Sequence, residues 1–158
     1  MKTVYLSIGS NVGDREAHLA RALGRLAEND LRVLRASGVY ETEPRDVPDQ
    51  AWFLNQVVEA ETELFPIQLL GRLQKIERAL GRLPGLPKGP RAIDLDILLY
   101  GDAIVSVPDL DIPHPRMGDR RFVLEPLAEL APDLRHPRTG QTVREMLAQV
   151  GNQRVQKI

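Results

Sequence analysis

The sequence predicts an α+β fold, an α/β sandwich with a ferredoxin-like β-α-β-β-α-β core, an antiparallel sheet and a helical C-terminal extension. The first observation behind this prediction is the order of segments, because stretches with the two-residue period of strands alternate with stretches of helical period. The second is that 158 residues, 42% of them hydrophobic and 27% charged, suit a chain with one core. We find no repeat and no change of composition, and therefore expect one domain over residues 1–158.

The first two elements lie before residue 28. Residues 3–8 alternate polar and apolar side chains, which predicts a strand. A turn over residues 9–13 follows, and Asp14 is placed to cap the next helix. The apolar stripe of that helix is Leu19, Leu23 and Leu26. The turn lacks the Lys-Ser/Thr ending of a phosphate-binding P-loop, so we do not favour that interpretation.

Two further strands are predicted on either side of a long loop. Residues 31–40 form the second strand and residues 51–62 the third. The ten residues between them contain two prolines, and loops of that length in compact domains are often functional. On the third strand the side chains predicted to face the core are Leu54, Val58 and Ala60. Phe53 and Asn55 are predicted to share the opposite face with Val57.

The second helix is predicted to begin near Pro66 and to end at Gly81, which is a plausible C-cap. Its apolar stripe is Leu69, Leu73, Ile76 and Leu80. Residues 82–89 are rich in proline and glycine, which predicts a mobile flap.

The last third of the chain is predicted to contain less regular structure. Turn signals occur at Gly101-Asp102, Pro108 and Pro113-His114-Pro115. Short helices are expected around residues 125–130 and 142–150. The polar tail after Val150 is expected to be loosely ordered.

The stretch Gly89–Tyr100 carries the strongest chemical signal. As a strand it places Asp94 and Asp96 on one face, about 6.5 Å apart at the usual rise per residue. The apolar face is predicted to hold Ile93, Leu95, Ile97 and Leu99. Two adjacent carboxylates repel unless a cation lies between them, and Mg²⁺ typically takes one or two carboxylates plus substrate phosphates. The alternative is that both aspartates are simply the solvated face of an edge strand.

Positively charged groups cluster around this stretch in a chain whose net charge is only −1. They are Arg82, Lys88, Arg91, His114, Arg116, Arg120 and Arg121. Cations beside a pair of carboxylates suggest a polyphosphate with its metal ions, because phosphoryl transfer depends on positioning and charge neutralisation. We expect about half of these groups to be ordinary surface charges.

Composition excludes several classes of protein. The chain has no cysteine, so disulfides and thiolate sites are excluded. Its near-zero net charge gives no reason to expect binding to nucleic acid or to an anionic membrane. No window approaches the roughly 20 apolar residues of a membrane span, and the N-terminal apolar run is too short for a signal peptide. We therefore expect a cytoplasmic monomer.

Several motifs together resemble the 6-hydroxymethyl-7,8-dihydropterin pyrophosphokinase family. The central motif is Gly89-Pro90-Arg91-Ala-Ile-Asp94-Leu-Asp96. The resemblance covers nearly the whole chain and includes Gly9-Ser10-Asn11, Tyr40-Glu-Thr42-Glu-Pro44, Asp49 to Asn55, Glu77 with Gly81-Arg82, Pro113-His114 and Arg120 to Leu127. It implies an enzyme that moves the terminal pyrophosphoryl group of ATP to the hydroxymethyl oxygen of a reduced pterin and releases AMP, with two Mg²⁺ ions bridging the phosphates.

The resemblance also implies roles for individual residues on the nucleotide side. Asp94 and Asp96 would hold the metal ions, and Arg82 and Arg91 would stabilise charge on the transferred group. The implied ATP-binding residues are Gln74, Glu77, Arg82, Arg91, Ile97, His114 and Arg120. For His114 the alternative is a turn histidine fixed between two prolines.

The pterin side follows both from the resemblance and from chemistry. A flat bicyclic ring needs an aromatic sandwich, for which Phe53 and Phe122 are candidates, and Asn55 offers both a donor and an acceptor. The expected rim is Thr42, Glu43, Pro44 and Arg45, with Asp94 beside the pterin. The alternative is that both phenylalanines belong to the core.

The same fold also hosts RNA-binding and regulatory modules. An RNA-binding module would need exposed aromatics on a basic sheet surface, and the strand with Asp94 and Asp96 is acidic. A regulatory ligand-binding module would not need the paired aspartates.

Three features depart from the family pattern. Lys88 replaces an aromatic residue before Gly89, and Pro115 stands where some members have an aromatic. The run Leu-Pro-Gly-Leu-Pro after Arg82 lacks the second arginine that members commonly carry and is one residue shorter than in some of them. These departures bear on how the flap closes, and none concerns the metal ligands.

Overall fold

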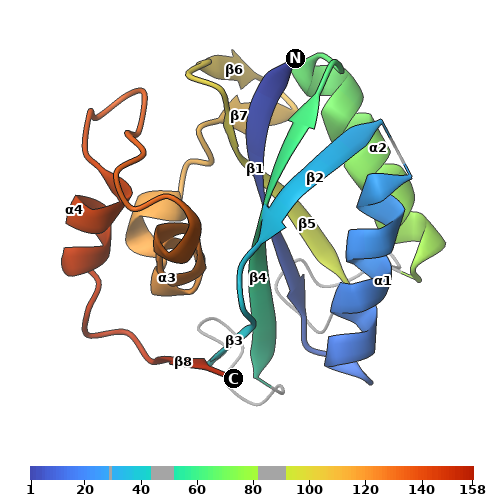
Figure 1. Ribbon diagram of the computed structural model, residues 1–158, viewed down its shortest axis with the longest axis horizontal. Helices are drawn as coiled ribbons and strands as arrows, with labels where there is room; N and C mark the ends of the chain where they lie inside the picture. The colour runs from blue at the N-terminus through green and yellow to red at the C-terminus, as the bar shows by residue number, and fades with distance from the viewer. Residues whose placement is uncertain (29, 44–51, 82–91) are drawn as a thin grey trace.

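A computed structural model shows one sheet between two helical layers, and it describes residues 1–28, 30–43, 52–81 and 92–158 (Figure 1). The strands are β1 (Lys2–Ser10), β2 (Leu31–Ala36), β3 (Tyr40–Thr42), β4 (Phe53–Thr62), β5 (Asp94–Tyr100), β6 (Val105–Val107), β7 (Leu110–Ile112) and β8 (Val155–Lys157). The helices are α1 (Arg15–Ala27), α2 (Pro66–Ala79), α3 (Arg121–Leu130) and α4 (Val143–Ala148), with a 3-10 turn at Met117–Asp119.

The main sheet is antiparallel and has the order β5-β1-β4-β3-β8, with β2 also paired to β4. The ferredoxin-like core is therefore confirmed, but the predicted strand over residues 31–40 is two strands. β2 pairs with the second half of β4 and β3 with its first half. At the break, the hydroxyl of Ser37 accepts from the backbone N–H of Val57 at 2.9 Å. A side chain thus takes over one bond of the ladder, which ends regular pairing there.

Helices α1 and α2 cover one face of the sheet (Figure 1). The carboxylate of Asp14 accepts from the backbone N–H of Ala17 at 3.1 Å, which confirms the predicted N-cap. Pro66 is the first residue of α2, and Gly81 follows its C-terminus with φ +94°, a conformation that favours glycine. The apolar core between these layers contains the predicted side chains Leu54, Val58 and Ala60.

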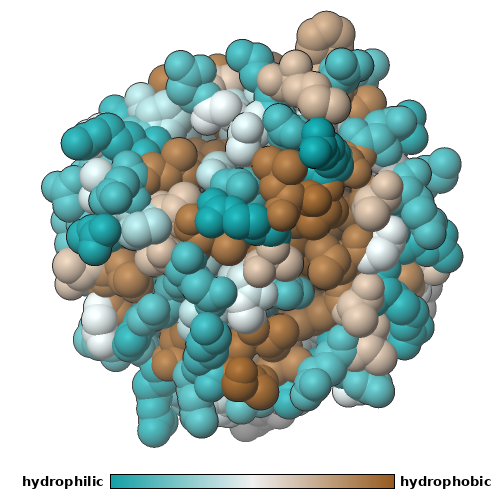
Figure 2. Space-filling model, in the orientation of Figure 1, coloured by the Kyte–Doolittle hydropathy of each residue, from teal (hydrophilic) through white to brown (hydrophobic). Residues whose placement is uncertain are grey.

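Helices α3 and α4 lie on the opposite face and close a second apolar cluster against the sheet. Val57 belongs to this cluster, which confirms that it faces away from Leu54. Helix α3 begins at Arg121, four residues earlier than predicted, and contains Pro126. Figure 2 shows, in the orientation of Figure 1, that apolar surface runs down the middle of this view, while the two sides are mostly hydrophilic.

Strand β5 changes faces partway along its length. Its pairing with β1 shifts between Tyr5 and Leu6, so that Leu99 lies opposite Tyr5 and Ile97 opposite Leu6. Leu98 is the extra residue of a β-bulge, which reverses the alternation beyond it. Leu99 consequently packs in the cluster below α3, while Ile97 packs below α1 and α2. The prediction that Leu99 shares a face with Ile97 is therefore wrong.

The C-terminal tail is ordered as β8, which contradicts the expectation of a loose tail. β8 pairs with β3, and the ammonium of Lys157 lies 3.1 Å from the carboxylate of Glu129 on α3. The same carboxylate accepts from the hydroxyl of Tyr40 at 2.7 Å.

The structure also contains a β6–β7 hairpin that was not predicted, because the sequence of this region indicated only turns. Among the described residues, no helix is long and apolar enough to cross a membrane.

Candidate functional site

Three strands place their functional residues in one row across the sheet. The register pairs Gly9 of β1 with Asp94 of β5 on one side and with Asn55 of β4 on the other. Directly paired residues of antiparallel strands point to the same face, and neighbouring strands lie about 4.8 Å apart. Asp94 and Asn55 therefore stand on the same face about 10 Å apart, with a residue that has no side chain between them.

Gly9 makes room for the amide of Asn55. A Cβ atom at this position would lie 3.1 Å from Oδ1 of Asn55 and 3.8 Å from Cδ1 of Phe53. The first of these contacts is tighter than ordinary packing, so a side chain here would press on Asn55. The lack of a side chain at Gly9 therefore leaves the amide of Asn55 the room it occupies.

The next row along the strands is Asp96, Ser7 and Val57. Because residues two apart on a strand share a face, Asp96 points to the same side as Asp94. Val57 marks that side as the α3 face. This confirms that both aspartates point away from Leu95, and both are half-buried.

The strand that bears the aspartates is held from below by α2. Glu77 is 7% exposed, and its Oε2 accepts from the backbone N–H of Leu95 at 2.8 Å. One oxygen of this carboxylate is thus engaged by the strand. Gln74, on the same helix, is exposed, whereas Ile97 is buried in the core below α1 and α2. For these three residues, contact with a nucleotide stays a prediction.

His114 lies beside β5 because its backbone N–H donates to the carbonyl of Leu98 at 3.0 Å. Its Nδ1 accepts from the backbone N–H of Arg116 at 3.1 Å, which places the ring proton of the neutral form on Nε2. Burial lowers the pKa of His114 to about 4, and Arg120 acts in the same direction, while Asp94 opposes them. At neutral pH the ring is therefore an uncharged donor near Asp94.

Arg120 and Phe122 lie together at the start of α3. The guanidinium of Arg120 stands 5.4 Å from the centroid of the Phe122 ring, a cation–π contact. Phe122 is only partly buried and packs at the edge of the cluster below α3. The alternative interpretation, that it is a core residue, is therefore correct for the part of its ring that contacts this cluster. Phe53 is also half-buried, at the start of β4 and on the same sheet face as Asn55.

Asn55 and Thr42 form a buried polar pair. The amide Nδ2 of Asn55 donates to Oγ1 of Thr42 at 3.0 Å, and the two residues are 4% and 3% exposed. This bond holds the amide of Asn55 in place beside β3. Glu43, next along the chain, is exposed and lies 3.8 Å from the guanidinium of Arg154.

The metal prediction rests on Asp94 and Asp96 alone, since no group of three or more His, Cys, Asp or Glu side chains gathers in the part of the chain that the structure describes. Two half-buried carboxylates on one face suit Mg²⁺, which keeps several water ligands and takes others from phosphates. They do not suit a structural zinc site, which needs nitrogen or sulfur ligands.

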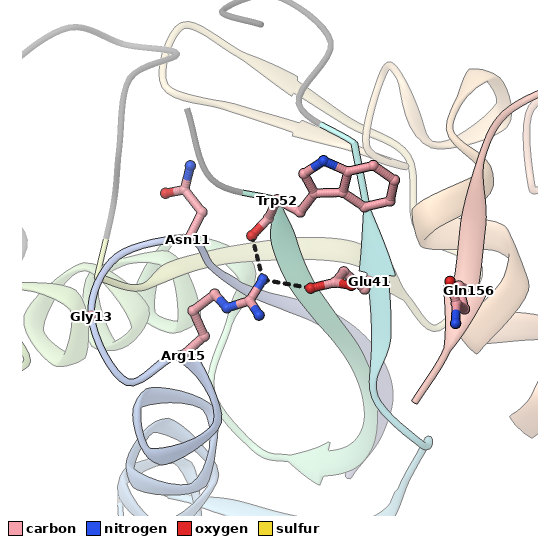
Figure 3. A pocket seen from close by; sticks show the side chains of 6 residues that line it. All are labelled: Asn11, Gly13, Arg15, Glu41, Trp52 and Gln156. Carbon is pink, nitrogen blue, oxygen red and sulfur yellow. Dashed lines mark hydrogen bonds and ion pairs between the residues drawn. The ribbon is translucent and has the colours of Figure 1, made fainter. Parts of the chain in front are cut away.

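An open cavity of about 560 Å³ lies at the end of β3 (Figure 3). Its lining residues are Asn11, Gly13, Arg15, Glu41, Trp52 and Gln156. None of them was among the predicted site residues, although Asn11, Glu41 and Trp52 belong to motifs of the family resemblance. These motifs are the feature of the sequence from which the cavity could have been predicted.

Several predicted residues lie outside the described parts of the chain. These are Pro44, Arg45, Arg82, Lys88 and Arg91, together with the proposed flap. Their assigned roles stay predictions.

Comparison with known proteins gives consistent results. A family model described as 7,8-dihydro-6-hydroxymethylpterin-pyrophosphokinase (HPPK) matches residues 5–132. A protein of Methylorubrum extorquens named 2-amino-4-hydroxy-6-hydroxymethyldihydropteridine pyrophosphokinase is 45% identical over 159 residues, covering 100% of this chain and 99% of that protein. The folic acid synthesis protein fol1 of Schizosaccharomyces pombe is 46% identical over 153 residues, which cover 96% of this chain. The matched part is 21% of fol1, so the chain spans about a fifth of that relative.

Solved structures share the fold. The crystal structure of Plasmodium falciparum HPPK-DHPS with pteroate superposes with a TM-score of 0.76 at 16% sequence identity. The match covers 94% of this chain and 42% of that one. At this identity the likeness concerns the fold alone.

Proposed function

The chain belongs to the 7,8-dihydro-6-hydroxymethylpterin-pyrophosphokinase (HPPK) family, and we propose that it transfers the terminal pyrophosphoryl group of ATP to 6-hydroxymethyl-7,8-dihydropterin. The products are AMP and the pterin diphosphate, in a step of folate biosynthesis. The observation that carries the proposal is the row of Asp94, Gly9 and Asn55, with Asp96 on the same face. It sets a pair of carboxylates on the same sheet face as a buried amide.

In the proposed reaction the hydroxymethyl oxygen of the pterin attacks the β-phosphorus of ATP. The bond from that phosphorus to the oxygen shared with the α-phosphate breaks, AMP leaves with the bond's electrons, and the hydroxyl proton is released. Catalysis of such a transfer consists mainly of positioning the two substrates and neutralising spread negative charge. The residues of this chain would supply both.

Asp94 and Asp96 would hold two Mg²⁺ ions, which when bound neutralise charge on the phosphates. His114 would donate through Nε2–H to a phosphate oxygen, which agrees with its neutral ring and the proton position. Arg120 would add a fixed positive charge nearby. The other proposed ATP-binding residues are Gln74, Glu77, Arg82, Arg91 and Ile97, with Arg82 and Arg91 acting on the transferred group.

The pterin would lie on the α3 face of the sheet. Asn55, already oriented by Thr42, would bind the polar edge of the ring. Phe53 and Phe122 would stack on its two sides. The rim would be completed by Glu43, Pro44 and Arg45, and Asp94 would lie next to the hydroxymethyl group.

We also propose that residues 1–158 form a single domain that acts as a cytoplasmic monomer. Size-exclusion chromatography with light scattering would test the oligomeric state. A mass near 17.7 kDa is expected, and a mass near twice that value would contradict it.

The experiment that tests the proposed function measures nucleotide products with Mg²⁺ and both substrates, and again with the pterin omitted. We expect AMP to form in step with pterin diphosphate, and neither product without the pterin. Release of ADP, or AMP formation that ignores the pterin, would contradict the proposal.

A further inference from the structure

Arg15 connects two parts of the chain that flank the segment 44–51. It is the first residue of α1, and its Nη1 donates to Oε2 of Glu41 at 2.8 Å and to the backbone carbonyl of Trp52 at 2.7 Å (Figure 3). The side chains of Arg15 and Glu41 are only 28% and 30% exposed. Charge-assisted bonds in such partly buried places are stronger than those of fully exposed pairs.

The two partners of Arg15 are the immediate neighbours of residues in the proposed pterin site. Glu41 precedes Thr42 on β3, and Trp52 precedes Phe53 on β4. Thr42 pairs directly with Phe53 in the ladder, and its hydroxyl accepts from Asn55. A shift of either strand end would therefore move the hydroxyl–amide pair and the aromatic ring relative to each other.

Arg15 itself lies on the far side of the sheet from this pair. The register pairs Glu41 with Leu54, whose side chain packs in the core below α1 and α2. It pairs Tyr40 with Asn55, on the α3 face. Because Glu41 points away from the face that bears Asn55, a guanidinium bound to it does not reach a pterin there.

Both hydrogen bonds come from the same nitrogen of a planar group. Their directions are therefore fixed relative to each other, and the carboxylate and the carbonyl are held at a set separation. The other described contacts between β3 and β4 are the ladder bonds and the Asn55–Thr42 bond.

We propose that Arg15 is a positioning residue for the pterin site. It holds the end of β3 and the start of β4 together from behind the sheet, so that Thr42, Phe53 and Asn55 keep the arrangement that binds the pterin. This inference rests on the proposed function. It predicts that loss of Arg15 weakens pterin binding selectively, while nucleotide binding through β5 is preserved.

The test compares Arg15→Met with the wild type and with Arg21→Met, a matched control at an exposed position of the same helix. Steady-state kinetics would give KM for the pterin, KM for ATP and kcat. For Arg15→Met we expect KM for the pterin to rise about tenfold or more, the effect of losing charged hydrogen bonds. We expect KM for ATP to stay within about twofold, and Arg21→Met to match the wild type.

A second readout does not depend on activity. Trp52 is the chain's single tryptophan, so its emission reports on the carbonyl partner of Arg15. We expect the emission of Arg15→Met to shift relative to wild type and Arg21→Met, and titration with the pterin alone to give a weaker affinity. Equal changes in the two KM values, or a lower melting temperature with unchanged pterin affinity, would overturn the inference.

If Arg15→Met does not fold, Glu41→Gln carries the test, because it keeps the shape of the acceptor and removes its charge. Glu41→Gln should also raise KM for the pterin, by a smaller factor than Arg15→Met does. Where both variants fold, their effects on pterin affinity should be less than additive, since they break one shared bond. Additive effects would overturn the inference. A wild-type protein that binds no pterin would instead contradict the proposed function on which it rests.

Discussion

The carboxylate of Glu77 accepts a hydrogen bond from the backbone N–H of Leu95, at a distance of 2.8 Å. Leu95 lies between Asp94 and Asp96, so a buried side chain of α2 holds the backbone between the two proposed metal ligands. The helix layer and the proposed metal site are thereby coupled through one bond.

Replacing Glu77 by alanine should affect both stability and metal use. The variant leaves the N–H of Leu95 without this acceptor in a buried place, which costs about 1–3 kcal/mol of the free energy of unfolding. Urea unfolding would measure this loss, and a higher Mg²⁺ concentration for half-maximal rate would report the loosened strand. Glu77→Gln keeps an oxygen that can accept from Leu95, so it should lose less stability and should raise the required Mg²⁺ concentration less. Lys75→Ala, exposed on the same helix, is the control and should change neither quantity.

Asp96→Asn should lower the rate of AMP formation by more than about a hundredfold at a fixed Mg²⁺ concentration. The reason is that loss of even an outer partner of a metal ligand costs about 10- to 100-fold. Asp102→Asn, in the exposed turn after β5, should leave the rate unchanged. A variant at Asp96 with the wild-type rate and Mg²⁺ dependence would remove the metal assignment.

Gly9→Ala should weaken pterin binding without a comparable loss of ATP binding. The new methyl group would lie 3.1 Å from Oδ1 of Asn55 and would displace an amide that Thr42 already holds. We expect pterin affinity to fall about tenfold, since misplacement of a binding group by 1 Å can cost about a hundredfold. Calorimetric titration with the pterin would measure the effect.

The control for this substitution is Gly24→Ala. No atom lies within 4 Å of a Cβ built on Gly24 in α1, so the change should only favour the helix, by about 0.5–1 kcal/mol. A Gly9→Ala protein that binds the pterin as well as Gly24→Ala does would show that the room Gly9 leaves for Asn55 plays no part in binding.

The pKa of His114, lowered by burial to about 4 from an ordinary value of 6.5, predicts a pH dependence of stability. Between these two pH values the unfolded chain takes up a proton that the folded chain resists. The stabilisation is fully present above pH 6.5 and is lost as the pH falls through this range towards about 4. His114→Gln, which has no titrating ring, should therefore show a shallower fall of Tm over the same range. Parallel Tm curves for the two proteins would be inconsistent with a half-buried His114 that is neutral in the folded chain.

The sequence was sufficient to predict those parts of the site that depend on strand alternation. Asp94 and Asp96 share one face, and Phe53 and Asn55 lie opposite Leu54, because a period of two governs any regular strand. The same rule failed at Leu99, because a bulge adds one residue without a distinctive sequence pattern.

Contacts between distant residues were beyond sequence reasoning. The tail forms β8 because β3 offers an edge and Glu129 offers a carboxylate, and neither partner is visible from the tail itself. Arg15 similarly reaches Glu41 and Trp52, which lie 26 and 37 positions away. Charge and hydrogen-bonding capacity could be predicted from residue type, whereas the choice of partner depends on the packed fold.

The bulge at Leu98 divides β5 into two segments with different tolerance of mutation. Residues before it keep their register through Gly9 and Ser7, while Leu99 and Tyr100 keep theirs through Tyr5 and Val4. A deletion of Leu98 would remove the bulge, and Leu99 and Tyr100 would follow Ile97 in regular alternation, still opposite Tyr5 and Val4 and on the faces they occupy now. The aspartates are aligned by strand pairs on the other side of the irregularity, so the damage would be the loss of the buried Leu98 side chain from the cluster below α3. Natural or engineered variation in the second half of β5 can therefore change the stability of the protein while leaving its acidic pair in place.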